Sequence, residues 1–573
     1  MAGSYPDLKK ITLMLTLALL VLVYFLHLGY NDIWNPNEGY YADAVREMYQ
    51  RNNFLEFYFN DELRFNKPPL TYWSIAASVA VFGMNEFAIR FPMALMALLT
   101  IYFTFLTGKR LFGEKEGLLA AIVMALSLQF IVNARYSSPE IPLTCFFGLT
   151  MYLFIKGYLD RELKFLLLSY LSLGGTLLAK GYPYLIIIAA IIMLYILIEC
   201  DFKLKEYWQR IKFLRLELGV PIVLIVGFSW PAYMYWLHGD LFFEVLNAET
   251  VDRALHYKSR GWSDLFFYIE ISSWGFLPYS LAFFYALFFF IKNKRLKEIA
   301  FPLSWLIVMF VIFTVAKGKL PTYFIQAHMA MALITARCLA VKIPKNRADN
   351  IIRYITLWFP GLLISVLNIV LVVVFDINYM FLVVVLLPLL LWVALFREQS
   401  PFIRKLSSYF QVKEGLNWHY LKFFPFYSFL TSMVIFAAFI LPQLESYRPY
   451  DQIKTAVDER DIDTEVSLWL EDQLLFNLPY YVKRKVLNEK SLQEIKSHAR
   501  QSDRLLALVS EDHIGHFPTA QLLWSGWVYN KNSEAKFFRF VSGYLKTKQG
   551  DFSDYRRLCL IYMETSKNEI SQH

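Results

Sequence analysis

The chain has 573 residues, of which 57% are hydrophobic and 18% aromatic, and its formal net charge is +9. A mean hydropathy of +0.38 excludes an ordinary soluble protein, because a soluble chain of this length buries a core but keeps a polar average. The positive charge gathers in short segments between apolar runs, which excludes a nucleic-acid-binding surface as its main origin. We therefore predict an α-helical polytopic membrane protein.

Thirteen apolar runs approach the roughly 20 residues that a helix needs to cross a hydrocarbon core of about 30 Å. The first lacks a small-residue cleavage site and is long for a removable signal peptide, so we expect it to remain as an anchor. In chain order the runs are 9–29, 86–108, 117–134, 139–155, 165–179, 182–199, 217–237, 266–291, 300–316, 322–341, 354–375, 378–396 and 423–442.

The cations between these runs predict the orientation of the chain. If the N-terminus is cytoplasmic, six clusters of Lys and Arg all fall in cytoplasmic loops, as the positive-inside rule requires. These clusters lie at 109–115, 156–164, 203–215, 292–297, 342–347 and 397–413. An odd number of spans then places the polar tail, 443–573, on the outer side of the membrane.

Two predicted outer segments, 30–85 and 238–265, are too long for simple turns and are rich in aromatic residues. Loops of this length are usually functional or disordered, and their composition suits helices lying on the membrane surface. Within the first, the stretch 41–48 has the apolar period of a helix.

The tail alternates predicted helices and strands, which indicates a small α/β domain. The stretch 491–497 predicts a helix, 504–510 a buried strand, and 535–547 a later strand or hairpin.

Charged residues in the predicted outer loops are the candidates for chemistry, because a charge at membrane depth costs about 2.5–3.5 kcal/mol. Lysines, arginines and a tyrosine converging from separate loops suit a phosphate group, and carboxylates beside them suit a general base or metal ligand. A lipid-linked phosphate substrate fits both sets. The candidates are Asn37, Glu38, Asp43, Lys67, Arg135, Glu140, Lys180, Arg253, His256, Lys258, Arg260, Lys317, Lys319 and Tyr323.

Most of these candidates also have a structural interpretation. Lys67 precedes two prolines and the start of a helix, a place that favours an anion, but an interfacial lysine can equally extend toward water. Arg135 and Glu140 can pair with each other across a short turn, and Lys180 can extend from a helix end. The structural interpretation is favoured for Lys317, Lys319 and His256.

The stretch Asn35-Pro36-Asn37-Glu38 has the strongest structural interpretation. Asn35 as N-cap, Pro36 in the first helical position and Glu38 as capping partner predict a helix start that needs no catalytic role. This capping box leaves Asn37 unexplained.

The motifs WNPNEGYYADAVREM and FNKPPLTYW resemble those of the bacterial relatives of protein O-mannosyltransferases, and most of all the aminoarabinose transferases that modify lipid A. In that family an acidic motif is followed after thirty residues by K-P-P-L-x-Y-W, and the same spacing separates Asn37 from Lys67. The segments NARYSSPEIPLTCF, LLAKGYPY, SWPAYMY and GKLPTY continue the resemblance in order, over residues 10–340.

The resemblance implies a GT-C fold with about 13 transmembrane helices, periplasmic juxtamembrane helices and a C-terminal soluble α/β domain. It implies that 1–442 is a glycosyltransferase domain, with its active site on loops 30–85 and 238–265, and that 443–573 is periplasmic. The expected enzyme is a monomer of the bacterial inner membrane, surrounded by membrane lipids and without nucleic acid. It would move a sugar from a polyprenyl (undecaprenyl) phosphate to lipid A, another glycolipid or a protein.

The resemblance also assigns roles to residues. Lys67 and Arg253 would hold the carrier phosphate. Further substrate contacts would come from Lys180, Tyr323, Tyr41 and Tyr72. The acidic catalytic positions would be occupied by Asn37, Glu38 and Glu140.

Several positions depart from the family pattern. Asn37 and Glu140 each stand where Asp is usual, and Tyr40 where Arg is common. The resemblance also implies metal ligands at the positions of Asn66 and Thr250. The cofactor stays open, with a divalent metal as one alternative, but Asn and Thr bind zinc poorly, so these two positions argue against zinc.

Because an amide cannot accept a proton from a hydroxyl, two hypotheses remain: the acceptor is an already anionic phosphate, or Glu38 or Glu140 acts as the base. Two other functions also remain open, a transporter or flippase of lipid-linked sugars and a catalytically altered, acceptor-binding member. The sugar can be aminoarabinose, a uronic acid or a hexose.

Overall fold

The computed structural model describes residues 18, 21–252, 263–341, 347–383, 385–386, 424–529 and 537–564. Four candidates, Arg253, His256, Lys258 and Arg260, lie outside the described residues, as do most of the predicted spans 9–29 and 378–396. The chain forms two compact units. A helical unit comprises Met1–Leu26, Asn66–Leu70 and Met93–Phe439, and a mixed unit comprises His27–Phe65, Thr71–Pro92 and Ile440–His573.

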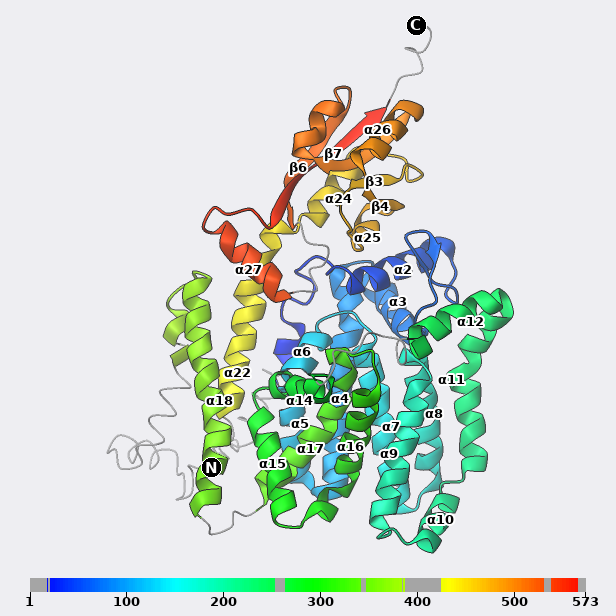
Figure 1. Ribbon diagram of the computed structural model, residues 1–573, viewed down its shortest axis with the longest axis vertical. Helices are drawn as coiled ribbons and strands as arrows, with labels where there is room; N and C mark the ends of the chain where they lie inside the picture. The colour runs from blue at the N-terminus through cyan, green and yellow to red at the C-terminus, as the bar shows by residue number, and fades with distance from the viewer. Residues whose placement is uncertain are drawn as a thin grey trace, which may run out of the picture. The chain divides into compact units, whose positions relative to one another are not determined.

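The helical unit consists mainly of helices (Figure 1). Helix α4 (Glu86–Phe112) leads into it from the mixed unit, and the following helices are α5 (Glu114–Ala125), α6 (Leu128–Ala134), α7 (Glu140–Asp160), α8 (Leu163–Lys180), α9 (Pro183–Glu199), α10 (Leu204–Phe213), α11 (Leu216–His238), α12 (Asp240–Asn247), α14 (Ser263–Gly275), α15 (Ser280–Lys292), α16 (Ala300–Val315), α17 (Ala327–Ala340), α18 (Arg347–Val374) and α22 (Phe424–Ile435).

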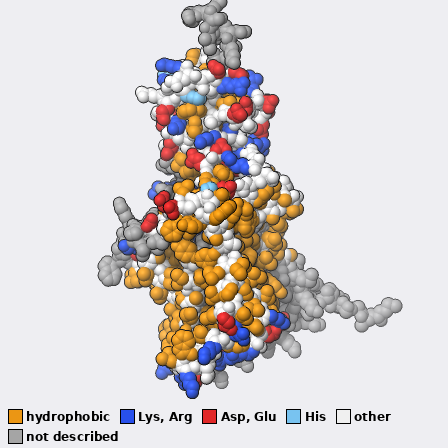
Figure 2. Space-filling view, turned by 90° about the vertical axis from the view of Figure 1, so that its right-hand side faces the viewer, with side chains coloured by type: hydrophobic (Ala, Val, Ile, Leu, Met, Phe, Trp, Pro, Cys, Tyr) orange, Lys and Arg blue, Asp and Glu red, His pale blue; other side chains and the backbone are white. Residues whose placement is uncertain are grey.

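Within the described residues, six helices are long and apolar enough to cross a membrane, or up to eight if each of two bent pairs counts as one span. Exposed apolar side chains such as Ile225, Trp236 and Val315 suit a surface that faces lipid. Figure 2 shows hydrophobic side chains covering a broad area of the molecule. The protein is therefore a multi-pass membrane protein, while the number thirteen stays a prediction.

Two predicted spans are broken in the structure. Run 266–291 becomes α14 and α15, which are bent by 120°, and run 117–134 becomes α5 and α6, bent by 66°. The two breaks are joined, since the Leu128 N–H donates to the Leu277 carbonyl at 3.0 Å and the Ser127 hydroxyl to the Gly275 carbonyl at 3.2 Å. The helix over the run 266–291 is interrupted near Pro278, which cannot donate a helical hydrogen bond.

The mixed unit combines a first-loop part with the tail. The first-loop part contains α2 (Asn37–Arg51), the hairpin strands β1 (Tyr58–Phe59) and β2 (Glu62–Leu63), and α3 (Leu70–Phe82). The tail contains α24 (Tyr450–Asp458), β3 (Leu468–Glu471), α25 (Leu478–Val482), β4 (Val486–Lys490), α26 (Leu492–Gln501), β5 (Arg504–Ser510), β6 (Gln521–Tyr529), α27 (Phe537–Thr547) and β7 (Tyr555–Glu564).

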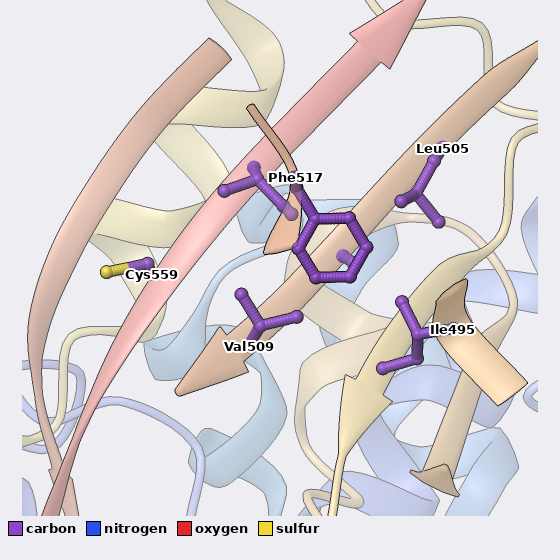
Figure 3. Close-up of a cluster of buried hydrophobic side chains, with 7 residues drawn as sticks. Ile495, Leu505, Val509, Phe517 and Cys559 are labelled. Atoms are coloured by element: carbon purple, nitrogen blue, oxygen red, sulfur yellow. The ribbon is translucent and has the colours of Figure 1, made fainter. Parts of the chain in front are cut away.

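The tail strands form a five-stranded sheet in the order β4-β3-β5-β7-β6. Strand β3 runs parallel to β4 and β5, and β7 runs antiparallel to β5 and β6. Figure 3 shows part of the apolar core beside this sheet, where Ile495 of α26 and Phe517 meet strand residues Leu505, Val509 and Cys559. This core makes the tail an α/β domain, as predicted.

Two of the three local predictions for the tail are confirmed. The helix predicted at 491–497 is α26, which starts with a capping box of Ser491 and Glu494, and the strand predicted at 504–510 is β5. The strand predicted at 535–547 is wrong, because α27 occupies it. Phe540, Tyr544 and Thr547 are spaced by four and three residues, and this helical period buries all three on one side.

Candidate active site

Helix α2 begins one residue later than the capping box predicted. Its N-cap is Pro36, without a side-chain hydrogen bond, and Asn37 is the first helical residue. The Asn35 amide is used elsewhere in the mixed unit: its oxygen accepts from the Phe476 N–H at 2.9 Å and its nitrogen donates to the Leu474 carbonyl at 3.2 Å. The predicted capping box is therefore wrong, because a partner distant in sequence takes the side chain that would have capped the helix.

Glu38 is completely buried and forms an ion pair with Arg90 at the start of α4. Its two oxygens accept from the Arg90 guanidinium at 3.0 and 2.8 Å, and one also accepts from the Trp34 N–H at 2.9 Å. Arg90 donates further to the carbonyls of Leu28, Asn31 and Asp32. This network ties the chain before α2 to α4 and thereby fixes where α2 starts.

Asn37, unlike the buried Glu38 that follows it, is exposed at the N-terminal end of α2. Tyr41 follows it by one helical turn, so the two side chains emerge on the same side of the helix. The backbone beside them is tightly packed, since a Cβ on Gly39 would lie 2.4 Å from the Phe476 carbonyl oxygen. A reactive side chain at position 37 is thus held by rigid backbone and remains accessible.

Asp43 is also completely buried, in a network that positions the β1–β2 hairpin. Its carboxylate accepts from Arg46 Nε at 2.6 Å and from the Asn60 N–H at 2.8 Å. Burial raises the pKa of Asp43 to about 6, although the nearby Arg46 opposes the rise. These contacts give Asp43 a structural role in the mixed unit.

In the helical unit, Lys67 pairs with Glu249, a residue that the sequence did not single out. The other oxygen of Glu249 accepts from the Asn66 amide at 3.3 Å. Glu249 lies in the short helical turn Ala248–Asp252 that follows α12. The sequence signal that could have identified Glu249 is an acidic residue in a long predicted outer loop, next to Thr250. The Glu249 carboxylate therefore binds Lys67 of the K-P-P-L motif and Asn66 directly before it.

The described residues do not fit the metal site that the family resemblance implied at Asn66 and Thr250. No group of three His, Cys, Asp or Glu side chains gathers anywhere in the described chain. The Asn66 amide, at one expected ligand position, donates its hydrogen to Glu249. We derive no step through a metal.

Another ion pair between candidate residues of the helical unit joins Glu140 and Lys180 at 2.6 Å, with side chains only 11% and 10% exposed. Glu140 begins α7 and Lys180 ends α8, so each charge sits at the helix end that favours it. The Lys180 ammonium also lies 5.0 Å from the ring centroid of Tyr323. The structure thus brings together three residues that the sequence placed in separate loops.

Two other candidate cations satisfy backbone groups of the helical unit. Arg135 donates to the carbonyls of Val23 and Leu26, both at 2.6 Å. Lys319 donates to three carbonyls at the end of α16, those of Phe313, Thr314 and Ala316. These bonds favour the structural interpretation of Lys319. Glu140 has Lys180 as its partner where the sequence had suggested Arg135.

Comparison with known proteins places this geometry in a family. Residues 66–230 match the family of dolichyl-phosphate-mannose-protein mannosyltransferases. A relative from Wigglesworthia glossinidia brevipalpis, named undecaprenyl phosphate-alpha-4-amino-4-deoxy-L-arabinose arabinosyl transferase, is 27% identical over 58% of this chain and 59% of its own length. The crystal structure of ArnT from Cupriavidus metallidurans bound to undecaprenyl phosphate shares the fold, with a TM-score of 0.71 and 18% identity over 96% of this chain and 97% of that one.

A protein of Aquifex aeolicus whose function is uncharacterized is 31% identical over 96% of this chain and 99% of its own length. The chain belongs to the ArnT-like membrane glycosyltransferases. The predictions of a GT-C fold and of the family are thereby confirmed. Its match to the named arabinosyl transferase spans about 59% of that relative.

Proposed function

We propose that this ArnT-like enzyme transfers a sugar from a polyprenyl phosphate, such as undecaprenyl phosphate, to an acceptor at the periplasmic face of a bacterial inner membrane. The observation that carries the proposal is the Lys67–Glu249 pair, in which the Glu249 carboxylate binds the lysine of the K-P-P-L motif. An anionic phosphate can take the place of that carboxylate beside the ammonium. The name of the arabinosyl transferase and the ligand of the ArnT crystal structure support a polyprenyl carrier.

In the proposed reaction an acceptor oxygen attacks the anomeric carbon of the sugar, and the bond from that carbon to the phosphate oxygen breaks. The electron pair leaves with the polyprenyl phosphate, whose charge Lys67 neutralises. Arg253 has the same proposed role, and Lys180, Tyr323, Tyr41 and Tyr72 contact the substrate. A single displacement inverts the anomeric carbon.

The carboxylates divide into different proposed roles. Both oxygens of Glu38 are held by Arg90 and the Trp34 N–H, so we assign Glu38 to positioning α2. Glu140 pairs with Lys180 and is our candidate base for a hydroxyl acceptor. Asn37 can hydrogen-bond a substrate through its exposed amide, but it cannot accept a proton. A phosphate acceptor, as on lipid A, would need no base.

The carrier-phosphate role is tested by Lys67→Ala. We expect transfer from a polyprenyl-phosphate sugar to fall by about a hundredfold or more, because removing one group that stabilises developing charge costs this much in enzymes. The exposed Lys317 provides a matched control, and Lys317→Ala should transfer normally. A near-normal rate for Lys67→Ala, measured with the purified protein, would exclude the assignment.

Glu140→Gln separates the two kinds of acceptor. With a hydroxyl acceptor we expect a loss of about 10²–10⁴-fold, the usual contribution of a general base, and a flattened pH–rate profile. With a phosphate acceptor we expect a loss of less than about tenfold, because an ionised phosphate oxygen needs no base. The measurement is transfer by purified enzyme to each acceptor.

The broken pairs α5–α6 and α14–α15 also favour a second candidate, a transporter of lipid-linked sugars, since interrupted helices are typical of transporter binding sites. Transfer activity in detergent, where no compartments exist, supports the enzyme. Movement of the donor across proteoliposome membranes without transfer would support the transporter.

A further inference from the structure

A helix connects β6 and β7 where a short turn would suffice. The two strands are antiparallel neighbours that pair as far as Tyr529 and Tyr555, and such ends can be joined by a turn of a few residues. Here residues 530–554 join them, and α27 (Phe537–Thr547) lies within this connection. Connections between the elements of a rigid scaffold are where binding functions are usually found.

Helix α27 packs against the end of a membrane span. The 22-residue candidate span Phe426–Tyr447 is long enough to cross a hydrocarbon core of about 30 Å, and its last residues, from Ile440 onward, belong to the mixed unit. There the Tyr544 hydroxyl donates to the side-chain oxygen of Gln443 at 3.1 Å, and the ring centroids of Tyr544 and Tyr447 lie 6.2 Å apart. These contacts hold α27 at the level where the span ends.

Aromatic contacts also hold α27 to the segment before α2. The Trp34 ring meets Phe537 and Phe540 edge to face, with ring centroids 6.1 and 6.0 Å apart. Arg448, which directly follows the span, places its guanidinium 3.9 Å from the ring centroid of Trp34. Trp and Tyr side chains at the end of a span are typical of the membrane–water interface.

A second side of α27 is apolar and does not take part in these contacts. Phe540 and Tyr544 are buried on the packed side. Phe538, Val541 and Leu545 are spaced by three and four residues, so they share a different face of the helix. Phe538 is 88% exposed, and Val541 and Leu545 are half-buried. This apolar stripe suits contact with lipid, because it lies on a helix held at the end of a span.

Cations border the apolar stripe. Arg539 and Lys548 are exposed, and Lys546, which pairs with Asp554 at 2.9 Å, keeps 44% of its side chain exposed. An apolar stripe bordered by Lys and Arg is the pattern of a helix that lies in the plane of the membrane surface. Its cations are then attracted by anionic headgroups.

We propose that α27 lies in the membrane surface, with Phe538, Val541 and Leu545 among the lipids and with Arg539 and Lys548 against anionic headgroups. The partner is the lipid bilayer itself. Burying the exposed Phe538 ring in lipid removes apolar surface from water, which is favourable. A protein can also cover such a ring, but a helix held at the end of a span meets lipid without a further partner. The inference concerns anchoring of the tail domain and does not depend on the proposed function.

The test uses the full-length protein in lipid nanodiscs, with a fluorophore attached through Phe538→Cys. All four cysteines of the chain are buried, so the label should react mainly with the introduced thiol, and labelled wild type gives the background. We expect nitroxides on the lipid acyl chains to quench this label, and iodide in the buffer to quench it weakly. Shallow and deep nitroxides together should place the label about 5–10 Å into the boundary between headgroups and acyl chains.

Leu522→Cys supplies a matched control, because Leu522 is also apolar and is 49% exposed in the same unit. It lies on β6 seven residues before Tyr529, whose ring packs on Phe540 of α27. At about 3.3 Å per residue, the strand separates Leu522 from that end by roughly 23 Å. We expect iodide to quench the Leu522→Cys label strongly and the lipid nitroxides to leave it unquenched.

Anionic lipid should increase the nitroxide quenching of the Phe538→Cys label relative to zwitterionic lipid, and Arg539→Gln should reduce that difference. No dependence on lipid charge overturns the headgroup contact. Equal iodide quenching at positions 538 and 522 overturns the insertion. A label that is shielded from iodide but out of reach of the lipid nitroxides overturns it as well, because the Phe538 face would then contact protein, such as a second copy of the chain.

Discussion

Replacing Glu38 by Gln distinguishes a positioning carboxylate from a catalytic one. The side chains of Glu38 and Arg90 are 0% and 2% exposed, and they meet in two hydrogen bonds of 3.0 and 2.8 Å. The Gln amide keeps one oxygen for the Trp34 N–H but turns an N–H group toward the guanidinium. Arg90 then remains buried with its charge uncompensated.

Removing one partner of a buried ion pair lowers the free energy of unfolding by about 3–5 kcal/mol. Because the Gln side chain keeps the hydrogen bond from the Trp34 N–H, we expect Glu38→Gln to fall near the lower end of this range. For a unit of about 150–250 residues, each kcal/mol lowers the melting temperature by roughly 2–4 °C, so we expect a fall on the order of 10 °C. Arg90→Gln should lower the free energy of unfolding further, because Arg90 also donates hydrogen bonds to the carbonyls of Leu28, Asn31 and Asp32.

The assay is thermal unfolding of the purified protein in detergent, followed by tryptophan fluorescence, together with transfer rates well below the transition. We expect a lowered melting temperature and, at low temperature, a rate within about tenfold of the wild type. An unchanged melting temperature with loss of transfer would refute this reasoning, since Glu38 would then act on the substrate and not on the fold.

Two further predictions concern the mixed unit. The raised pKa of Asp43, about 6, means that the folded state binds its proton more tightly than the unfolded state, so stability should fall as pH rises from about 4 to about 6, by roughly 3 kcal/mol from this group. Asp43→Asn should remove that pH dependence in denaturant titrations, and an equally steep dependence in the variant would contradict the assignment. Gly39→Ala places a Cβ 2.4 Å from the Phe476 carbonyl oxygen and should cost about 1–3 kcal/mol of unfolding free energy. At Gly515 a Cβ meets nothing within 4 Å, so Gly515→Ala is the control, and equal melting temperatures for the two variants would rule out the close approach.

Features that depend on local pattern were determined by the sequence. Apolar runs long enough to cross a bilayer identified a membrane protein, and the spaced motifs around Asn37 and Lys67 identified the glycosyltransferase family. Strand β5 and helix α26 were also predicted correctly, because a continuous apolar run and a Ser-x-x-Glu capping box act over a few residues.

Partner choice was decided only by the tertiary structure. Asn35 looked like a helix cap but binds backbone more than 430 residues away, and Glu38 pairs with Arg90 across 52 residues. Lys67 meets Glu249 across 182 residues, a carboxylate with no motif of its own. Side-chain hydrogen bonds and ion pairs are satisfied by whichever group the fold brings near. The sequence therefore named the reactive residue types, and the fold decided which charged side chains pair with one another.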